Sequence, residues 1–206
     1  MSNTKTVGRL ENWDAADIGA QTSFITLEEG SNIVRIVSSP YQSYSHWTTD
    51  ATNQTRKVTC CMKDCPCCER GEQSKPRWFF AVLSRKTGTI GILEVGSQIF
   101  KQIRELSKKT KWGDPRGYDL DLQKMPKGSQ PLYVVCPEPR EALTDQEKTL
   151  VRTAMEKLDL QKLTEAPTPT AVCEKLGIAQ KACLASAEDE VPADNEDGFD
   201  FNFDSK

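Results

Sequence analysis

The chain has little of what a membrane protein, a secreted protein or an acid–base enzyme needs. Its 206 residues include one histidine and 7% aromatic residues. It has no apolar run of about 18 residues, the length that a transmembrane helix requires. The first residues show no apolar stretch behind a basic start, so we expect no signal peptide there. We therefore expect a cytosolic protein, in which thiols stay reduced and stable disulfides are rare.

Signatures of catalysis are also scarce. The sequence has neither a glycine-rich phosphate loop nor a G-x-S-x-G nucleophile motif. If His46 is a metal ligand, no other histidine is left to act as a general base. Asp119 and Asp121 lie two apart on one face of a predicted strand. Such a pair could bind a metal ion, but we interpret it as the solvent-facing side of an amphipathic strand. We therefore expect no enzymatic activity.

The charge is unevenly distributed, although the formal net charge is only −3. Residues 188–206 contain eight acidic residues and one basic residue, which leaves 26 basic and 22 acidic residues in 1–187. Residues 54–127 contain 16 basic and 8 acidic residues. A basic body with an acidic tail is typical of a protein that binds polyanions and whose tail competes with them. A solvated surface with a solubilising tail is the alternative.

Short apolar runs with alternating polarity predict a fold that is mainly β with some α. A hairpin turn is expected at Lys86-Thr87-Gly88, and residues 97–109 have helical spacing with Ser97 as the N-cap. Five or so strands with one helix placed late among them favour a small five-stranded barrel. The predicted strands lie in residues 31–39, 41–48, 77–96 (two strands), 117–125 and 131–137.

The remaining segments predict appendages on this barrel. Thr144 to Glu147 form a capping-box pattern that begins a helix extending to about Asp159. A linker at 165–170 precedes a short C-terminal helix, and the acidic end should be disordered. The predicted organisation is an N-terminal arm (1–28), a barrel core (29–140) with a metal loop (46–71), a helical segment (141–186) and an acidic disordered tail (187–206).

The segment from His46 to Gly71 is rich in soft metal ligands, with the only histidine and five of the eight cysteines. Cys65 and Cys68 form a C-x2-C pair, a spacing at which two thiolates bind one tetrahedral ion. One imidazole with three thiolates is a ligand set of structural zinc, and a closed set of four leaves no position for a catalytic water. We therefore predict one structural Zn²⁺ ion bound by His46, Cys60, Cys65 and Cys68.

Other interpretations of these cysteines are weaker. A disulfide knot is disfavoured in a reducing compartment. A redox C-x-x-C motif lies between a strand and a long helix, whereas this one lies in a charged loop. A cluster of free thiols, with His46 as an ordinary strand residue, is a further alternative. Spacing alone also allows Cys61 to replace Cys60 as a ligand, so that choice stays open.

Several aromatic residues lie in or beside the basic region. Trp47 precedes the cysteines, Trp78 follows Arg77, and Trp112 lies among lysines. Basic side chains neutralise phosphates and exposed rings stack on unpaired bases, which favours single-stranded over duplex nucleic acid. For each ring, ordinary core packing is the alternative.

Four stretches of the sequence resemble those of a known protein family. The chain is similar to the single-stranded DNA-binding (helix-destabilising) proteins of T-even and other tailed bacteriophages. The similar stretches are the His-Trp pair at 46–47, the C-x4-C-x2-C loop, "RWFFAVLSRKTGTIGILEVGSQIFKQI" and "WGDPRGYDLDLQK". The resemblance covers about residues 25–140. It implies an oligonucleotide/oligosaccharide-binding (OB) fold with an inserted zinc-binding subdomain. It also implies sequence-independent coating of single-stranded DNA in phage replication, recombination and repair, in the cytoplasm of the infected bacterial host.

The resemblance also implies site residues. The family's histidine followed by three cysteines maps onto the four metal ligands named above. Its DNA cleft of aromatic and basic residues corresponds by region and residue type, and two basic residues of the metal loop, Arg56 and Lys57, complete the candidate set. The expected DNA-binding residues are Tyr41, Tyr44, Trp47, Arg56, Lys57, Arg77, Trp78, Lys101, Lys108, Lys111 and Trp112.

The two ends of the chain carry further expectations. The N-terminal arm is mixed in charge where the family has a basic one, so we expect only weak self-association on DNA. The acidic tail agrees with the family and is expected to recruit phage or host replication and recombination proteins. Its expected contact residues are Phe199, Asp200, Phe201, Phe203 and Asp204. The second hypothesis for the whole chain is a zinc-ribbon adaptor that binds a replication or transcription protein.

Overall fold

The computed structural model describes residues 23–178, which form two compact units. Unit 1 contains the described residues up to Tyr44 together with Lys75–Glu165. Unit 2 contains Ser45–Ser74 and the described residues from Ala166 onward. The expected tail residues Phe199, Asp200, Phe201, Phe203 and Asp204 lie outside the described residues, as do residues 1–22 of the expected arm.

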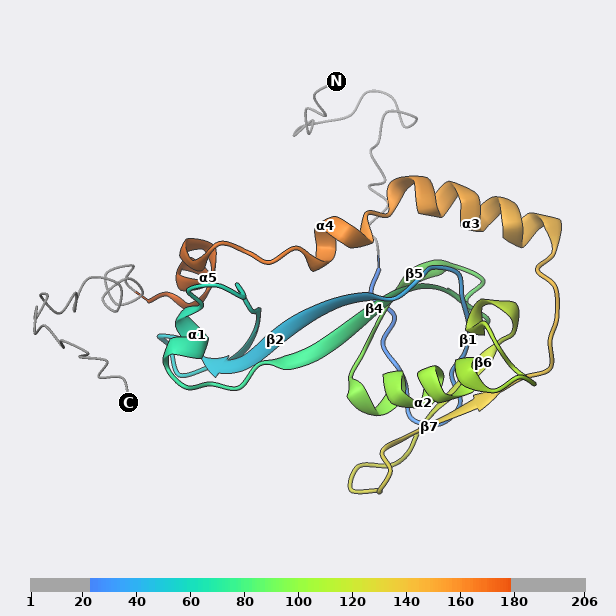
Figure 1. The fold of residues 1–206 in the computed structure, drawn as a ribbon, viewed down its shortest axis with the longest axis horizontal. Coiled ribbons are helices and arrows are strands. Elements are labelled where there is room, and N and C mark those ends of the chain that lie inside the picture. The colour runs from blue at the N-terminus through green and yellow to red at the C-terminus, as the bar shows by residue number, and fades with distance from the viewer. Residues whose placement is uncertain (1–22, 179–206) are drawn as a thin grey trace, which may run out of the picture. The chain divides into compact units, whose positions relative to one another are not determined.

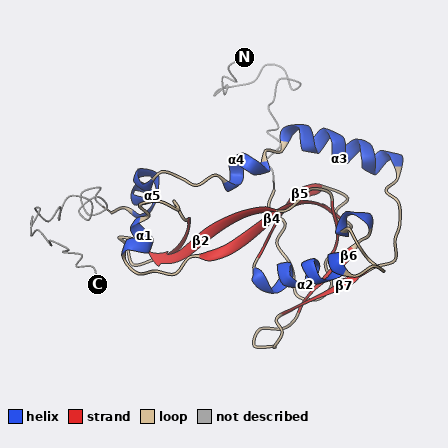
Figure 2. Cartoon of the chain, viewed as in Figure 1, coloured by secondary structure: helices blue, strands red, loops and turns tan. Residues whose placement is uncertain are grey.

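The described part of the chain is mainly β, with several helices (Figures 1 and 2). The order of neighbouring strands is β3-β2-β4-β1-β6-β7, and β5 pairs with β4. The strands are β1 (Ile33–Ile36), β2 (Tyr41–Thr49), β3 (Thr55–Thr59), β4 (Lys75–Ser84), β5 (Ile90–Val95), β6 (Leu120–Lys124) and β7 (Tyr133–Pro137). The helices are α1 (Pro66–Glu69), α2 (Ser97–Lys108), the 3₁₀ helix η2 (Pro115–Gly117), α3 (Asp145–Lys157), α4 (Leu160–Thr164) and α5 (Pro169–Leu176).

The prediction of a closed five-stranded barrel is wrong. The seven strands form one open antiparallel sheet. The additional strand in the metal loop is β3, which was not predicted because its sequence, TRKVT, is polar and basic. It is a strand because it pairs with β2 from Ser45↔Thr59 to Thr49↔Thr55. Local periodicity finds the other strands but carries no information on whether the ends of the sheet meet.

The core of unit 1 lies between the sheet and one face of α2. Phe80, Val82 and Leu93 are buried on β4 and β5, and α2 contributes the buried residues Ile99 and Ile103. Those two side chains lie four positions apart, so they share a face of the helix. The predicted helix is confirmed, although its N-cap is Gly96 and Ser97 is its first residue.

Asp119 and Asp121 are buried, so their predicted position on a solvent-facing side is wrong. Asp119 forms ion pairs with Arg35 and with Arg85, the latter at 2.7 Å. Arg85 also pairs with Glu147, the capping-box residue of α3. Asp121 accepts hydrogen bonds from Ser31 Oγ and from the Asn32 backbone N–H. A buried carboxylate needs such partners, and here they fasten β1, β4 and β6 together.

Unit 2 is built on the β2–β3 hairpin and on α5. The backbone N–H of Ala51 in the hairpin turn donates to the Leu176 carbonyl oxygen at the end of α5. Val58 of β3 and Val172 of α5 are buried. The predicted C-terminal helix is confirmed where it is described, and it ends at Gly177, whose φ of 66° suits a left-handed C-cap. Within residues 23–178, no helix combines the length and apolar character needed to cross a bilayer.

Candidate metal centre and nucleic-acid interface

The β2 strand points two consecutive side chains in opposite directions. Successive residues of a strand face opposite sides, and His46 is fully buried whereas the side chain of Trp47 is 54% exposed. His46 pairs with Val58 across the β2–β3 ladder, and Trp47 pairs with Lys57. One strand therefore delivers an imidazole to the interior of unit 2 and an aromatic ring to its surface.

The cysteines reach the same interior through a tight loop. Met62 and Asp64 have φ angles of 68° and 50°, so the chain turns through the left-handed region between Cys60 and Cys65. Pro66 begins α1, and the backbone N–H of Glu69 donates to the carbonyl oxygen of Cys65. This short helix turns Cys68 back toward Cys65, as a C-x2-C pair requires.

The four predicted ligands converge on one point. The ligand atoms of His46, Cys60, Cys65 and Cys68 all lie within 4.8 Å of one another. His46 Nε2 lies 3.6 Å from the sulfur of Cys65 and 3.6 Å from that of Cys68, and the sulfurs of Cys60 and Cys68 are 3.7 Å apart. A tetrahedron with Zn–S bonds of about 2.3 Å and a Zn–N bond of about 2.05 Å has edges of about 3.8 Å and about 3.6 Å. The cluster therefore has the dimensions of a tetrahedral N/S metal site and can hold a metal ion.

The structure also shows which of the adjacent residues Cys60 and Cys61 lies with the other candidate ligands. Cys60, and not Cys61, belongs to the group of four. Burial raises the pKa of Cys61 to about 12, and the neighbouring Cys65 adds to the effect. Burial likewise raises the pKa of Cys67 to about 11. Neither Cys61 nor Cys67 belongs to the group of four.

The pKa values of the candidate ligands shift in different directions. Burial lowers the pKa of His46, with opposition from Glu72, so the imidazole is neutral and its lone pair is available. Burial acts to raise the pKa of Cys65, but backbone N–H groups of the loop outweigh it and lower that pKa overall. Burial and the neighbouring thiols raise the pKa of Cys68 to about 12. A divalent ion would remove this penalty by neutralising the crowded thiolates.

A second group of side chains lies behind His46. A carboxylate oxygen of Glu72, the Cys67 sulfur and a ring nitrogen of His46 lie within 4.8 Å of one another. Thr48 donates to Glu72 Oε1 at 2.7 Å, and Arg70 forms an ion pair with the same oxygen at 3.1 Å. A carboxylate that accepts a hydrogen bond from a histidine ligand fixes its tautomer and ring orientation, but here His46 Nδ1 and Glu72 Oε2 are both buried without a hydrogen-bond partner. Glu72 was not among the residues expected from the sequence, because only the fold brings residue 72 next to Thr48 of β2.

In unit 2 the expected DNA-binding residues lie on the β2–β3 hairpin. Trp47 is exposed, with Lys57 opposite it. Arg56 is exposed and forms an ion pair with Asp50 at 2.8 Å. The face of the hairpin that carries Trp47 therefore also carries Lys57, whereas Arg56, which pairs with Thr48, belongs to the other face. An aromatic ring beside a basic side chain is the combination that stacks on an unpaired base and contacts a phosphate.

In unit 1 the expected rings are half-buried. Trp78 stacks on Phe100 with ring centroids 4.1 Å apart and planes 3° apart. Trp112 packs against Tyr118, and Lys111 Nζ lies 5.0 Å from the Trp112 ring centroid. Phe100 was not among the expected DNA-binding residues. The sequence does place it one helical turn from the basic residue Arg104 on α2, a signal that could have identified it.

The remaining expected residues of unit 1 are scattered. Arg77 forms an ion pair with Glu94 at 3.6 Å, Lys101 is exposed on α2, and Lys108 pairs with Glu105 at 2.9 Å. Tyr41 is partly buried against the cluster of Phe79, Ala81, Ile92 and Leu160, and the Tyr44 hydroxyl accepts a hydrogen bond from Gln42.

Comparison with known proteins adds no family assignment. No protein-family model matches the sequence, and no curated protein matches it either.

Proposed function

We propose that the protein is a zinc-containing, non-enzymatic protein that coats single-stranded DNA without sequence preference. The observation that carries the proposal is the alternation on β2: His46 joins the metal cluster while Trp47, the next residue, is exposed opposite Lys57. A metal ion that fixes His46 also fixes the strand that presents the ring. The metal therefore has a structural role in the binding face.

Zinc is the ion that the ligands favour. Three thiolates with one imidazole suit Zn²⁺, and four protein ligands complete a tetrahedral shell. The β2–β3 hairpin and the cysteine loop that follows it together supply the four ligands. The ion would therefore link the hairpin to the loop through coordinate bonds, in a unit that has few buried apolar side chains. Such a site contributes on the order of 10 kcal/mol to folding at neutral pH.

The biological setting follows from the sequence resemblance and stays a proposal with it. The protein would act in phage replication, recombination and repair, in the cytoplasm of the infected bacterial host. Its partners would be single-stranded DNA and, through the acidic tail, replication and recombination proteins of phage or host. Self-association on DNA would be weak. Although the barrel is absent, an open sheet with an exposed aromatic and basic face can serve the same purpose.

The experiment that tests the function compares Trp47→Ala with the wild type. Binding of a labelled oligo(dT) is measured by fluorescence anisotropy at low salt. One base stacked on an aromatic ring contributes about 1–3 kcal/mol, so the variant should bind about 5- to 150-fold more weakly. Leu150→Ala, which removes an exposed apolar side chain from α3, is the control and should bind like the wild type. A wild-type protein that does not bind the oligonucleotide would refute the function and favour the zinc-ribbon adaptor.

A further inference from the structure

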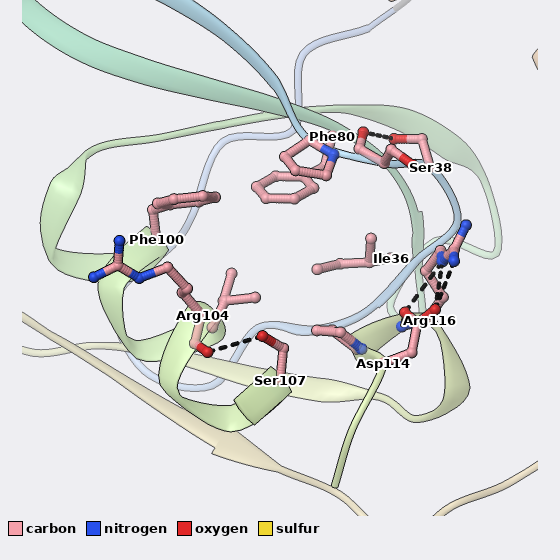
Figure 3. A pocket seen from close by; sticks show the side chains of 12 residues that line it. Ile36, Ser38, Phe80, Phe100, Arg104, Ser107, Asp114 and Arg116 are labelled. Atoms are coloured by element: carbon pink, nitrogen blue, oxygen red, sulfur yellow. Dashed lines mark hydrogen bonds and ion pairs between the residues drawn. The ribbon is translucent and has the colours of Figure 1, made fainter. Parts of the chain in front are cut away.

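Unit 1 contains a cavity that none of the expected DNA-binding residues lines. Its volume is about 240 Å³. This is smaller than the roughly 300–1,000 Å³ of pockets for drug-sized ligands, so it suits one small planar group. Figure 3 shows Phe80, Phe100 and Ile36 around the cavity, with Arg104 and Arg116 on opposite sides of it.

The lining divides into an apolar part and a polar rim. Phe80 is buried, and the Phe100 ring is held in place by Trp78, which stacks on it. At the rim, the side chain of Arg104 is 55% exposed and its closest carboxylate, that of Glu105, is 4.0 Å away. Arg116 forms an ion pair with Asp114 at 2.6 Å. Arg104 is therefore the rim cation with the weaker ion pair, and it can approach an incoming anion.

We infer that this cavity holds one nucleotide of the single-stranded DNA, with its base against the aromatic side and its phosphate at Arg104. The inference rests on the proposed function and adds a specific subsite to it. Base and phosphate match the two halves of the lining: an apolar ring wall takes a planar base, and a guanidinium takes a phosphate in a bidentate contact. Trp78, which stacks on Phe100, extends the aromatic surface beyond the cavity.

Two variants test the subsite. Ser107 is exposed at the rim and its hydroxyl bonds only to its own helix, at the Arg104 carbonyl oxygen, so Ser107→Trp should fill the cavity without disturbing the core. Arg104→Ala removes the rim cation. Matched controls on the exposed face of α3 are Thr153→Trp and Arg152→Ala. Oligo(dT) affinity is measured by anisotropy over a range of salt concentrations, and circular dichroism verifies that each variant is folded.

Ser107→Trp should weaken binding about 5- to 150-fold, the equivalent of one stacked base. Arg104→Ala should make the log–log salt slope shallower by about 0.7, the value for one phosphate contact on a single strand. The controls should leave both quantities unchanged.

The outcomes separate the subsite from the function. If the wild type binds oligo(dT) but both variants bind like their controls, the subsite is refuted and the proposed function stands. If the wild type does not bind, both are refuted. Ring signals of Phe100 that shift with a peptide of residues 197–206, but not with oligo(dT), would assign the cavity to a protein segment and overturn the inference.

Discussion

At the scale of single residues, the metal site depends on which sulfur faces the imidazole. Cys60 and Cys61 are adjacent in sequence, but only Cys60 joins the cluster with His46. We therefore expect Cys60→Ser to lose the metal, because three ligands remain and a serine hydroxyl is a poor substitute for a thiolate. Cys61→Ser should retain it. Zinc content measured by plasma mass spectrometry, with native mass spectrometry of the same samples, checks both expectations. Metal loss from Cys61→Ser alone would reverse the assignment.

Glu72 carries a second prediction at this scale. Its carboxylate lies near the buried His46 ring and is held by Thr48. Removing an outer-shell carboxylate beside the ligands typically weakens metal binding by about 10- to 100-fold, so Glu72→Gln should weaken zinc affinity by that amount. Glu69→Gln, an exposed carboxylate of the same loop, is the matched control. Competition with a chromophoric zinc chelator gives both affinities, and equal values would show that Glu72 does not orient the ligand.

At the scale of elements, α3 is fastened by its first turn. Thr144 accepts a hydrogen bond from the Glu147 N–H, and Glu147 accepts one from the Thr144 N–H. Losing such a cap typically costs about 1 kcal/mol, so Thr144→Ala should lower the free energy of unfolding by about that amount. Thr149→Ala, further along the exposed face, should change it by less than about 0.5 kcal/mol. Urea unfolding of both variants measures the difference.

The same turn predicts a pH dependence. The Thr144 backbone N–H lowers the pKa of Glu147, against burial, and Arg85 adds to the lowering. A lowered pKa in the folded state means that the carboxylate stabilises the protein above its ordinary pKa of about 4.3. That contribution is lost as the pH falls through the folded value. The stability difference between wild type and Glu147→Gln should therefore be larger at about pH 6 than at about pH 3. A difference in unfolding free energy between wild type and Glu147→Gln that does not change with pH would contradict this prediction.

The elements also show what sequence can and cannot predict. Alternation and turn residues located β1, β2, the β4–β5 hairpin and α2, because those signals are local. The β3 strand was missed, since its five polar residues become a strand only through pairing with β2. Barrel closure was wrong, and so was the exposure of Asp119, because both depend on contacts between distant strands. Ligand spacing predicted His46 and three cysteines, whereas the choice of Cys60 needed the backbone turn at Met62.

At the scale of the whole molecule, the acidic tail should compete with DNA. Residues 188–206 carry eight acidic residues and one basic residue, against a basic body. Deleting them should tighten oligo(dT) binding at low salt, and the effect should shrink at about 1 M salt, where the Debye length is about 3 Å. Replacing the tail's acidic residues by Asn and Gln at constant length is the control for charge. Unchanged affinity after deletion would exclude competition by the tail.

The central claim is that one metal ion holds the strand that presents Trp47 to DNA. The most direct test is an oligo(dT) anisotropy titration of a single preparation before chelation of its metal, after chelation, and after zinc is restored. We predict tight binding at first, a loss of at least about tenfold in the stripped protein, which is about 1.4 kcal/mol, and full recovery with zinc. Equal affinity in all three states, with the fold intact, would contradict the account.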